Sequence, residues 1–162
     1  MIEFSHFDES GASRMVDTSA KQETERMARA SAIVRMAPEV GASVRNRQVT
    51  KGNVLEVARL AGILAAKKTA DLIPLCHPIP LTSVAVDYQW LDECRLRIES
   101  RVRCIARTGV EMEALVAVAL AALTVYDMCK SADRTMTIEC IQLEEKAGGR
   151  TGHFVRASQA DG

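Results

Sequence analysis

The segment LIPLCHPIPL, from Leu72 to Leu81, places a histidine and a cysteine inside a rigid apolar run. Proline lacks a backbone N–H and disfavours helix in the residue before it, so Pro74, Pro78 and Pro80 exclude a helix interior and a central strand. An imidazole has an unperturbed pKa near ~6.5, which suits proton transfer at neutral pH. His77 is therefore either a structural residue or an acid–base group, and the segment alone leaves both interpretations open.

Carboxylates and a lysine flank an uncharged stretch further along the chain. Residues 114–126 contain no charged side chain, whereas Glu111 and Glu113 precede them and Asp127 and Lys130 follow them. Asp127 and Lys130 are three residues apart, so on a helix they share a face, either as a surface ion pair or as acid–base groups at the rim of a core.

The length of that helix separates its two charged ends. At about 1.5 Å per residue, Glu111 and Asp127 lie roughly 24 Å apart along the axis. The two ends therefore serve separate purposes, or they meet in a site built across a subunit interface. We favour the interface, because an oligomer would also cover the open face of a sheet.

The elements that must position these residues follow from hydrophobic periodicity and capping signals. Alternation favours a strand over 24–36, although the alanines there also permit a helix. Further along we expect a helical turn with a mobile basic loop at 37–50, a helix capped by Asn53 and Glu56 over 54–72, strands at 82–91 and 94–107, a buried helix over about 108–130 and a strand at 135–145.

The order strand, helix, strand, strand, helix, strand predicts an α+β fold. It is the ferredoxin-like βαββαβ arrangement, an antiparallel sheet with helices packed on one face. With 162 residues, the chain suits a single domain over 1–162. We expect an irregular arm over about 1–22 and a flexible basic tail over about 147–162.

Composition and charge exclude several classes of function. Basic and acidic residues number 21 each and only 4% of residues are aromatic, so a protein that mainly coats nucleic acid is disfavoured. Five cysteines without a C-x-x-C pair favour a reduced compartment over a disulfide scaffold. No signal peptide and no apolar run of ~18 residues is visible, so we expect a cytoplasmic protein with no membrane span. No Cys/His cluster completes a metal site.

The residues alone therefore indicate a cytosolic oligomer with acid–base groups and local positive charge, suited to a small anionic substrate. Five phrases add a specific resemblance, to the molybdenum cofactor biosynthesis protein C family (MoaC), the cyclic pyranopterin monophosphate synthases. The phrases are MVDTSAK (15–21), KGNVLEVARLAGILAAKKTADLIPLCHPIPL (51–81), TGVEMEAL (108–115), AALTVYDMCK (121–130) and EKAGGRTG (145–152). The resemblance runs in order from about His6 to His153.

The resemblance implies a lyase of molybdenum cofactor biosynthesis. Its reaction converts (8S)-3′,8-cyclo-7,8-dihydroguanosine 5′-triphosphate to cyclic pyranopterin monophosphate and releases pyrophosphate. It also implies a homohexamer, a trimer of dimers, with active sites at the dimer interfaces. No cofactor is implied as required, and Mg²⁺ bound with the triphosphate is left open, because no ligand cluster in the sequence demands it.

Carried over residue by residue, the resemblance implies two sets of site residues. The implied catalytic residues are Asp127, Lys51, Lys130 and His77. The implied substrate-binding residues are Leu75, Cys76, His77, Met112 and Glu113, with Glu111, Arg26 and Lys67 as neighbours. No metal ligand is among them.

The chain departs from the family pattern at a few positions outside this acid–base set. Asn53 and Thr18 replace the usual aspartate and valine, and Arg150 keeps the positive charge of the usual lysine. We therefore expect an active enzyme. The main rival is a non-catalytic ferredoxin-like module that binds a purine nucleotide, which would need the pocket but not Asp127, Lys51 and Lys130 together.

Overall fold

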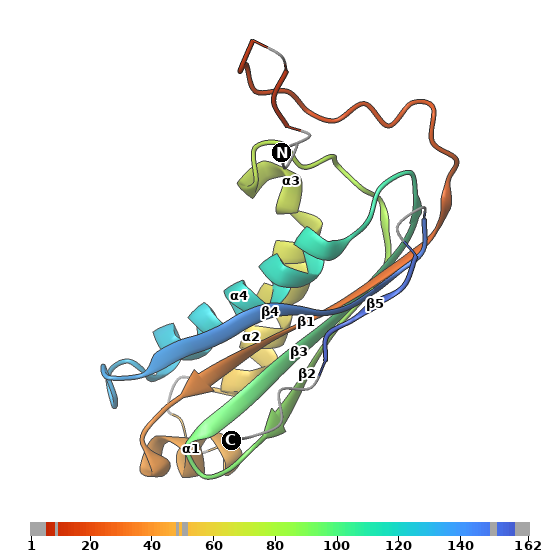
Figure 1. Cartoon of the computed structure of the whole chain (residues 1–162). Coiled ribbons are helices and arrows are strands. Elements are labelled where there is room, and N and C mark those ends of the chain that lie inside the picture. The colour runs from red at the N-terminus through yellow and green to blue at the C-terminus, as the bar shows by residue number, and fades with distance from the viewer. Residues whose placement is uncertain (1–5, 9, 48, 50–51, 150–151, 158–162) are drawn as a thin grey trace.

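Five strands form one antiparallel sheet, and two long helices cover one of its faces in the computed structural model (Figure 1). The structure describes residues 6–8, 10–47, 49, 52–149 and 152–157. The elements are β1 (Thr24–Arg35), α1 (Pro38–Arg45), α2 (Val54–Lys67), α3 (Thr69–Leu72), β2 (Leu81–Trp90), β3 (Arg95–Ala106), α4 (Glu111–Cys129), β4 (Thr137–Ala147) and β5 (Phe154–Val155).

The strand order is β2-β3-β1-β4-β5. All neighbouring strands pair antiparallel. With α2 and α4 as the two crossover helices, the first four strands of this order are those of a ferredoxin-like sheet. The predicted βαββαβ architecture is therefore confirmed.

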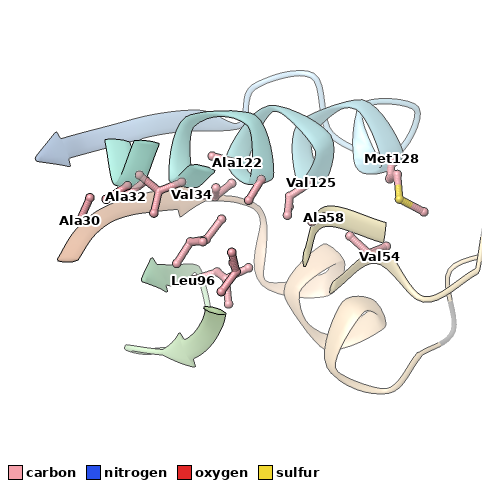
Figure 2. Packing of buried hydrophobic residues seen from close by; sticks show 14 of the residues in the cluster. Ala30, Ala32, Val34, Val54, Ala58, Leu96, Ala122, Val125 and Met128 are labelled. Carbon is pink, nitrogen blue, oxygen red and sulfur yellow. The ribbon is translucent and has the colours of Figure 1, made fainter. Parts of the chain in front are cut away.

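Alternating side chains decide which face of the sheet meets the helices. Every second residue of β3 is buried, as the predicted period of two requires. In β1 the residues Ala28, Ala30, Ala32 and Val34 are fully buried, and β1 pairs with β3 along its whole length. Residues 24–35 therefore form a strand, and the alternative of a helix is wrong. Figure 2 shows Ala30, Ala32 and Val34 packed beneath α4.

The first long helix begins as predicted but ends earlier. The Asn53 side chain accepts a hydrogen bond from the Glu56 N–H at 3.3 Å, whereas the Glu56 carboxylate pairs with Arg59. The predicted helix over 54–72 is wrong beyond Lys67. The buried hydroxyl of Thr69 donates to the carbonyls of Ala65 and Ala66, and such side-chain bonds compete with the helical pattern. The helix is interrupted at Lys68, and the chain continues as the short helix α3.

Helix α4 lies at the centre of the hydrophobic core. Ten of its residues are buried, and it packs against both the sheet and α2. By length and mean hydropathy, 1.7 over its most apolar window, α4 passes a test for a membrane span, but 56% of that window is buried inside the structure. In this chain it is a core helix.

Helices α2 and α4 run antiparallel and lie unusually close together. A Cβ atom added at Gly62 would stand 2.9 Å from the Ala117 carbonyl oxygen and 3.3 Å from the Ala121 Cβ. Val54 and Ala58, near the start of α2, lie beside Val125 and Met128, near the end of α4 (Figure 2). The end of α2 therefore lies beside the start of α4.

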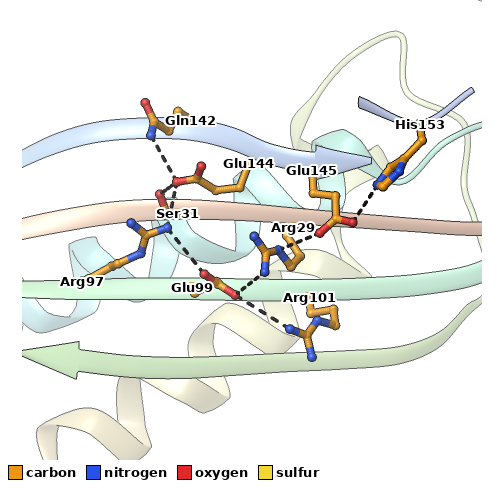
Figure 3. A network of polar contacts seen from close by, with 9 residues as sticks. All are labelled: Arg29, Ser31, Arg97, Glu99, Arg101, Gln142, Glu144, Glu145 and His153. Atoms are coloured by element: carbon orange, nitrogen blue, oxygen red, sulfur yellow. Dashed lines mark hydrogen bonds and ion pairs between the residues drawn. The ribbon is translucent and has the colours of Figure 1, made fainter. Parts of the chain in front are cut away.

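The opposite face of the sheet is polar. Arg97 pairs with Glu144 at 2.9 Å and Arg29 with Glu145 at 3.2 Å, and Ser31 donates a hydrogen bond to Glu144 (Figure 3). His153 contacts Glu145 at 2.8 Å, next to β5. Strand β5 was not predicted from the sequence; its residues Phe154 and Val155 pair with β4 inside the expected tail.

Because Gly62 leaves no room for a side chain, we expect Gly62→Ala to lower the free energy of unfolding by about 1–3 kcal/mol, the usual cost of overpacking. Urea denaturation at matched protein concentration measures this. Ala61→Ser adds one heavy atom to the same helical turn and should cost less than about 1 kcal/mol. A Gly62→Ala variant as stable as the wild type would show that the two helices are not fixed in close contact.

Candidate active site

The proline-rich corner between α3 and β2 forms a pocket of about 340 Å³ with the end of α2 and the start of α4. His77, Glu113 and Lys67 line it together. The Cys76 N–H donates to the Ile73 carbonyl at 3.1 Å, so the corner begins with a tight turn before the prolines. Three of the predicted site residues, from three separate elements, therefore converge. We name this cavity the corner pocket.

Glu113 is the most strongly perturbed carboxylate of the corner pocket. It is only 4% exposed, and burial raises the pKa of its carboxyl to about 7, with the charge of Glu111 adding to the shift. A group with this pKa accepts and donates protons equally well near neutral pH, as a general acid or base requires. The sequence placed Glu113 only among substrate-binding residues.

The thiol beside this carboxyl is not activated. Burial and the charge of Glu113 raise the pKa of Cys76, so the thiol stays protonated at neutral pH. Cys76 and Leu75 are half-buried at the corner. Their place fits the predicted role as walls of the site and gives no support for a nucleophilic cysteine.

A second and larger pocket, of about 850 Å³, lies on the other side of the first turn of α4. We name it the basic pocket, because it is lined by four cations and one carboxylate, namely Lys21, Arg26, Arg107, Lys146 and Glu111. Lys146 pairs with Glu111 at 3.1 Å. The remaining positive charge suits a polyphosphate, whose oxygens pair with guanidinium and ammonium groups.

The backbone at one edge of the basic pocket is shaped around Arg26. The Arg26 Nε donates to the Ala106 carbonyl at 3.4 Å, and a Cβ atom at Gly149 would collide with the Arg26 guanidinium. Gly149 has φ +76, a conformation that favours glycine. The turn after β4 therefore closes on the predicted site residue Arg26.

The amino-terminal arm lines the basic pocket and brings Asp17 near His77. Lys21 lines the basic pocket, and the Ser19 carbonyl accepts a hydrogen bond from Arg107 at 3.4 Å. Hydrogen bonds from Ser19 hold the pKa of Asp17 below its usual value, and the charge of His77 adds to this shift. None of these four residues was predicted as a site residue from the sequence: Asp17, Lys21, Arg107 and Lys146. The phrases MVDTSAK and EKAGGRTG, which contain three of them, were the available signal.

Asp127 and Lys130 lie at the far end of α4. Their side chains form an ion pair of 2.6 Å and are 66% and 52% exposed. The hydrogen bond and the charge of Asp127 raise the pKa of Lys130, so within one chain this lysine is a cation and not a base. Fourteen residues of continuous helix separate Glu113 from Asp127, which is about 21 Å.

The predicted site residues are therefore divided between the two ends of the helix pair. His77, Lys67 and Glu113 share the corner pocket, and Arg26 and Glu111 the neighbouring basic pocket. Met112 is 36% exposed on the first turn of α4, between them in sequence. Lys51 lies outside the described residues.

Within the described part of the chain, no group of three or more His, Cys, Asp or Glu side chains is placed to hold a metal ion. The fold is ferredoxin-like, the lining of the basic pocket suits an anionic ligand, and the corner pocket contains acid–base groups.

Comparison with known proteins gives the family. The MoaC family model matches residues 15–149. The cyclic pyranopterin monophosphate synthase of Thermomicrobium roseum is 59% identical over 158 residues, covering 96% of this chain and 95% of that protein. The synthases of Magnetococcus marinus and Desulfitobacterium hafniense are 56% and 50% identical, covering 98% and 96% of this chain and 98% and 95% of their own. The chain belongs to the MoaC family.

The raised pKa of Glu113 predicts a pH-dependent stability. The native state keeps this proton up to pH about 7, whereas the ordinary value is 4.5, so the stability that Glu113 contributes is present below pH 4.5 and is lost as the pH rises through about 7. We expect Glu113→Gln to raise the thermal unfolding midpoint relative to the wild type at pH 8, by the equivalent of roughly 2–3 kcal/mol, and to raise it little at pH 4.5.

The exposed carboxylate variant Glu93→Gln is the control, and it should leave the midpoint within about 0.5 kcal/mol of the wild type at both pH values. A difference between Glu113→Gln and the wild type that stays constant from pH 4.5 to 8 would mean that Glu113 is already ionised throughout this range.

Proposed function

We propose that this chain is a cyclic pyranopterin monophosphate synthase. The observation that carries the proposal is the identity of 50–59% with proteins of that name over nearly the whole chain. The substrate would be (8S)-3′,8-cyclo-7,8-dihydroguanosine 5′-triphosphate, and the products cyclic pyranopterin monophosphate and pyrophosphate. This reaction belongs to the biosynthesis of the molybdenum cofactor.

The basic pocket is our candidate for the triphosphate. Closing the cyclic phosphate requires a sugar hydroxyl to attack the α-phosphorus, which forms one P–O bond as the bond to the departing pyrophosphate breaks. Negative charge develops on the phosphoryl and leaving oxygens, and cations stabilise it. Arg26, Lys146 and Lys21, which line this pocket, would supply the stabilising charge. Glu111, already paired with Lys146, would hold that lysine in position.

The corner pocket is our candidate for the purine-derived ring system. Rearrangement of that ring needs several proton transfers, for which Glu113 and His77 are neighbours with suitable chemistry. Lys67 adds a cation at the same pocket. The two pockets flank one helical turn, so a substrate with a ring at one end and a triphosphate at the other would cross the start of α4.

In this proposal a second subunit contributes three residues to each site, namely Asp127, Lys130 and Lys51. Asp127 stands about 21 Å from Glu113 along a rigid helix, so one chain cannot bring both to one ring. An isologous dimer whose twofold axis is perpendicular to α4 would place each end of α4 opposite the other end in its partner. We propose a homohexamer, a trimer of dimers, in which each site combines His77 and Glu113 of one chain with Asp127, Lys130 and Lys51 of its dimer partner.

The remaining expectations concern cofactors and location. We propose that the reaction needs no cofactor, and that Mg²⁺ would enter only with the triphosphate it accompanies. The five cysteines are free thiols, which supports a reducing compartment such as the cytoplasm.

The direct test is to incubate the purified protein with the cyclised dihydroguanosine triphosphate and to measure pyrophosphate and pyranopterin together. The wild type should form both in equal amounts, and Asp127→Asn should lose at least about 100-fold in turnover, the usual contribution of a general acid or base. The variant Glu93→Gln, at an exposed carboxylate outside both pockets, is the control for loss of a surface carboxylate.

Equal turnover by the wild type and Asp127→Asn would keep the enzyme but remove Asp127 from its chemistry. Tight binding of the substrate with no product would instead favour the regulatory nucleotide-binding module.

A further inference from the structure

A third cavity lies away from both pockets described above, between the end of α1, the start of α2 and the end of β2. Its volume is about 470 Å³. The fourteen residues of α2 separate its Asn53 edge from the corner pocket by about 21 Å. We name it the Trp90 pocket; its lining includes Arg45, Arg47, Leu55, Arg59, Tyr88 and Trp90.

Two of its arginines are fixed on aromatic rings. The Arg45 guanidinium lies 4.4 Å from the centre of the Trp90 ring and donates to the carbonyls of Asp92 and Glu93 at 3.3 and 3.1 Å. The Arg59 guanidinium lies 5.2 Å from the centre of the Tyr88 ring. Stacked guanidiniums with anchored N–H groups are held in position before any ligand arrives.

The charges of the Trp90 pocket do not cancel. Its two carboxylates, Glu56 and Asp87, both pair with Arg59, at 3.0 and 3.4 Å. Within the described part of the chain, Arg45 and Arg47 have no carboxylate partner. Three arginines and two carboxylates line the cavity, so the lining has a net charge of +1, and the guanidiniums of Arg45 and Arg47 are the groups placed to pair with an anion.

Arg47 has a backbone conformation that its side chain opposes. It follows α1 with φ 55, in the left-handed region where glycine is favoured at the end of a helix. Its N–H donates to the Val44 carbonyl at 3.3 Å, which closes the helix end. A strained residue at the rim of a cavity points to a role for its side chain.

Tyr88 also lines this pocket. The Tyr88 hydroxyl is buried and, among the described residues, accepts or donates no hydrogen bond. Burial raises the pKa of Tyr88, so the hydroxyl stays protonated. Because its oxygen is enclosed by protein atoms, Tyr88 contributes its ring and not its hydroxyl to the lining of the cavity.

We propose that the Trp90 pocket binds a phosphate-bearing anion, with Arg47 and Arg45 pairing with its oxygens. A cavity of this size exceeds what one phosphate fills and lies in the range of small-molecule sites, with Val44 and Leu55 as an apolar wall. The anion is a free pyrophosphate or the diphosphate of a nucleotide. This site is separate from the basic pocket and does not depend on the proposed function.

The chain supplies its own probe, because Trp90 is its single tryptophan. Its emission is recorded while inorganic pyrophosphate or guanosine diphosphate is added, with sodium chloride at equal ionic strength as a blank. We expect a saturable change in the wild type for at least one of the two. A tighter dissociation constant for guanosine diphosphate would identify a nucleotide site, and equal constants a pyrophosphate site.

Arg47→Gly removes the side chain without straining the backbone, because glycine readily adopts φ 55. The variant should therefore fold at least as well as the wild type. It should weaken binding at least about tenfold, as expected for loss of one charged hydrogen bond. Arg103→Ala, which removes an exposed arginine of β3, should bind as the wild type does.

Calorimetric titration with pyrophosphate gives a second measurement that does not rely on emission, because it counts sites. The wild type should show one site per chain whose dissociation constant is at least about tenfold larger in Arg47→Gly. If emission shows no saturable change and the two proteins bind pyrophosphate identically, the Trp90 pocket is not an anion site. The same conclusion follows if Arg47→Gly binds as tightly as the wild type.

Discussion

The close packing of α2 against α4 is the constraint on which the rest of the structure depends. Gly62 faces the Ala117 carbonyl with no space for a side chain, and the buried alanines of β1 bring the sheet up to the same layer. Two helices pressed together in this way behave as a rigid block. The groups at its two ends are therefore held about 21 Å apart, and no side-chain rotation brings them together.

The first turn of α4 shows how burial differentiates two similar carboxylates. Glu111 is paired with Lys146 in the basic pocket, whereas Glu113 is 4% exposed and has a pKa of about 7. Two residues along a helix point to different sides, so one turn presents an ion pair to one cavity and a protonatable group to the other. The division fits a substrate that is anionic at one end and undergoes proton transfers at the other.

Much of the fold could be predicted from periodic patterns, and much of the site could not. The alternation in β3 and the uncharged run of α4 specify a strand and a buried helix wherever they lie. The end of α2 depends on the bonds of Thr69 to Ala65 and Ala66, and β5 is a two-residue pairing without a periodic signal. The resemblance to the MoaC family identified Asp127 and His77 as candidate site residues. The burial of Glu113 and the convergence of Lys21, Arg107 and Lys146 arise from tertiary contacts, which no local sequence pattern reveals.

The central claim, that one active site takes residues from the two ends of different chains, is tested by mixed oligomers. Asp127→Asn and Glu113→Gln chains, each inactive alone, are co-expressed with different tags, and the doubly tagged species are assayed beside unmixed parents. A dimer of the two variants has one intact site and one site that lacks both groups. Random mixing makes about half of the dimers mixed, so we predict roughly a quarter of wild-type turnover before tag selection and more in the doubly tagged species. Turnover in verified hetero-oligomers no higher than in the parents would contradict a shared site.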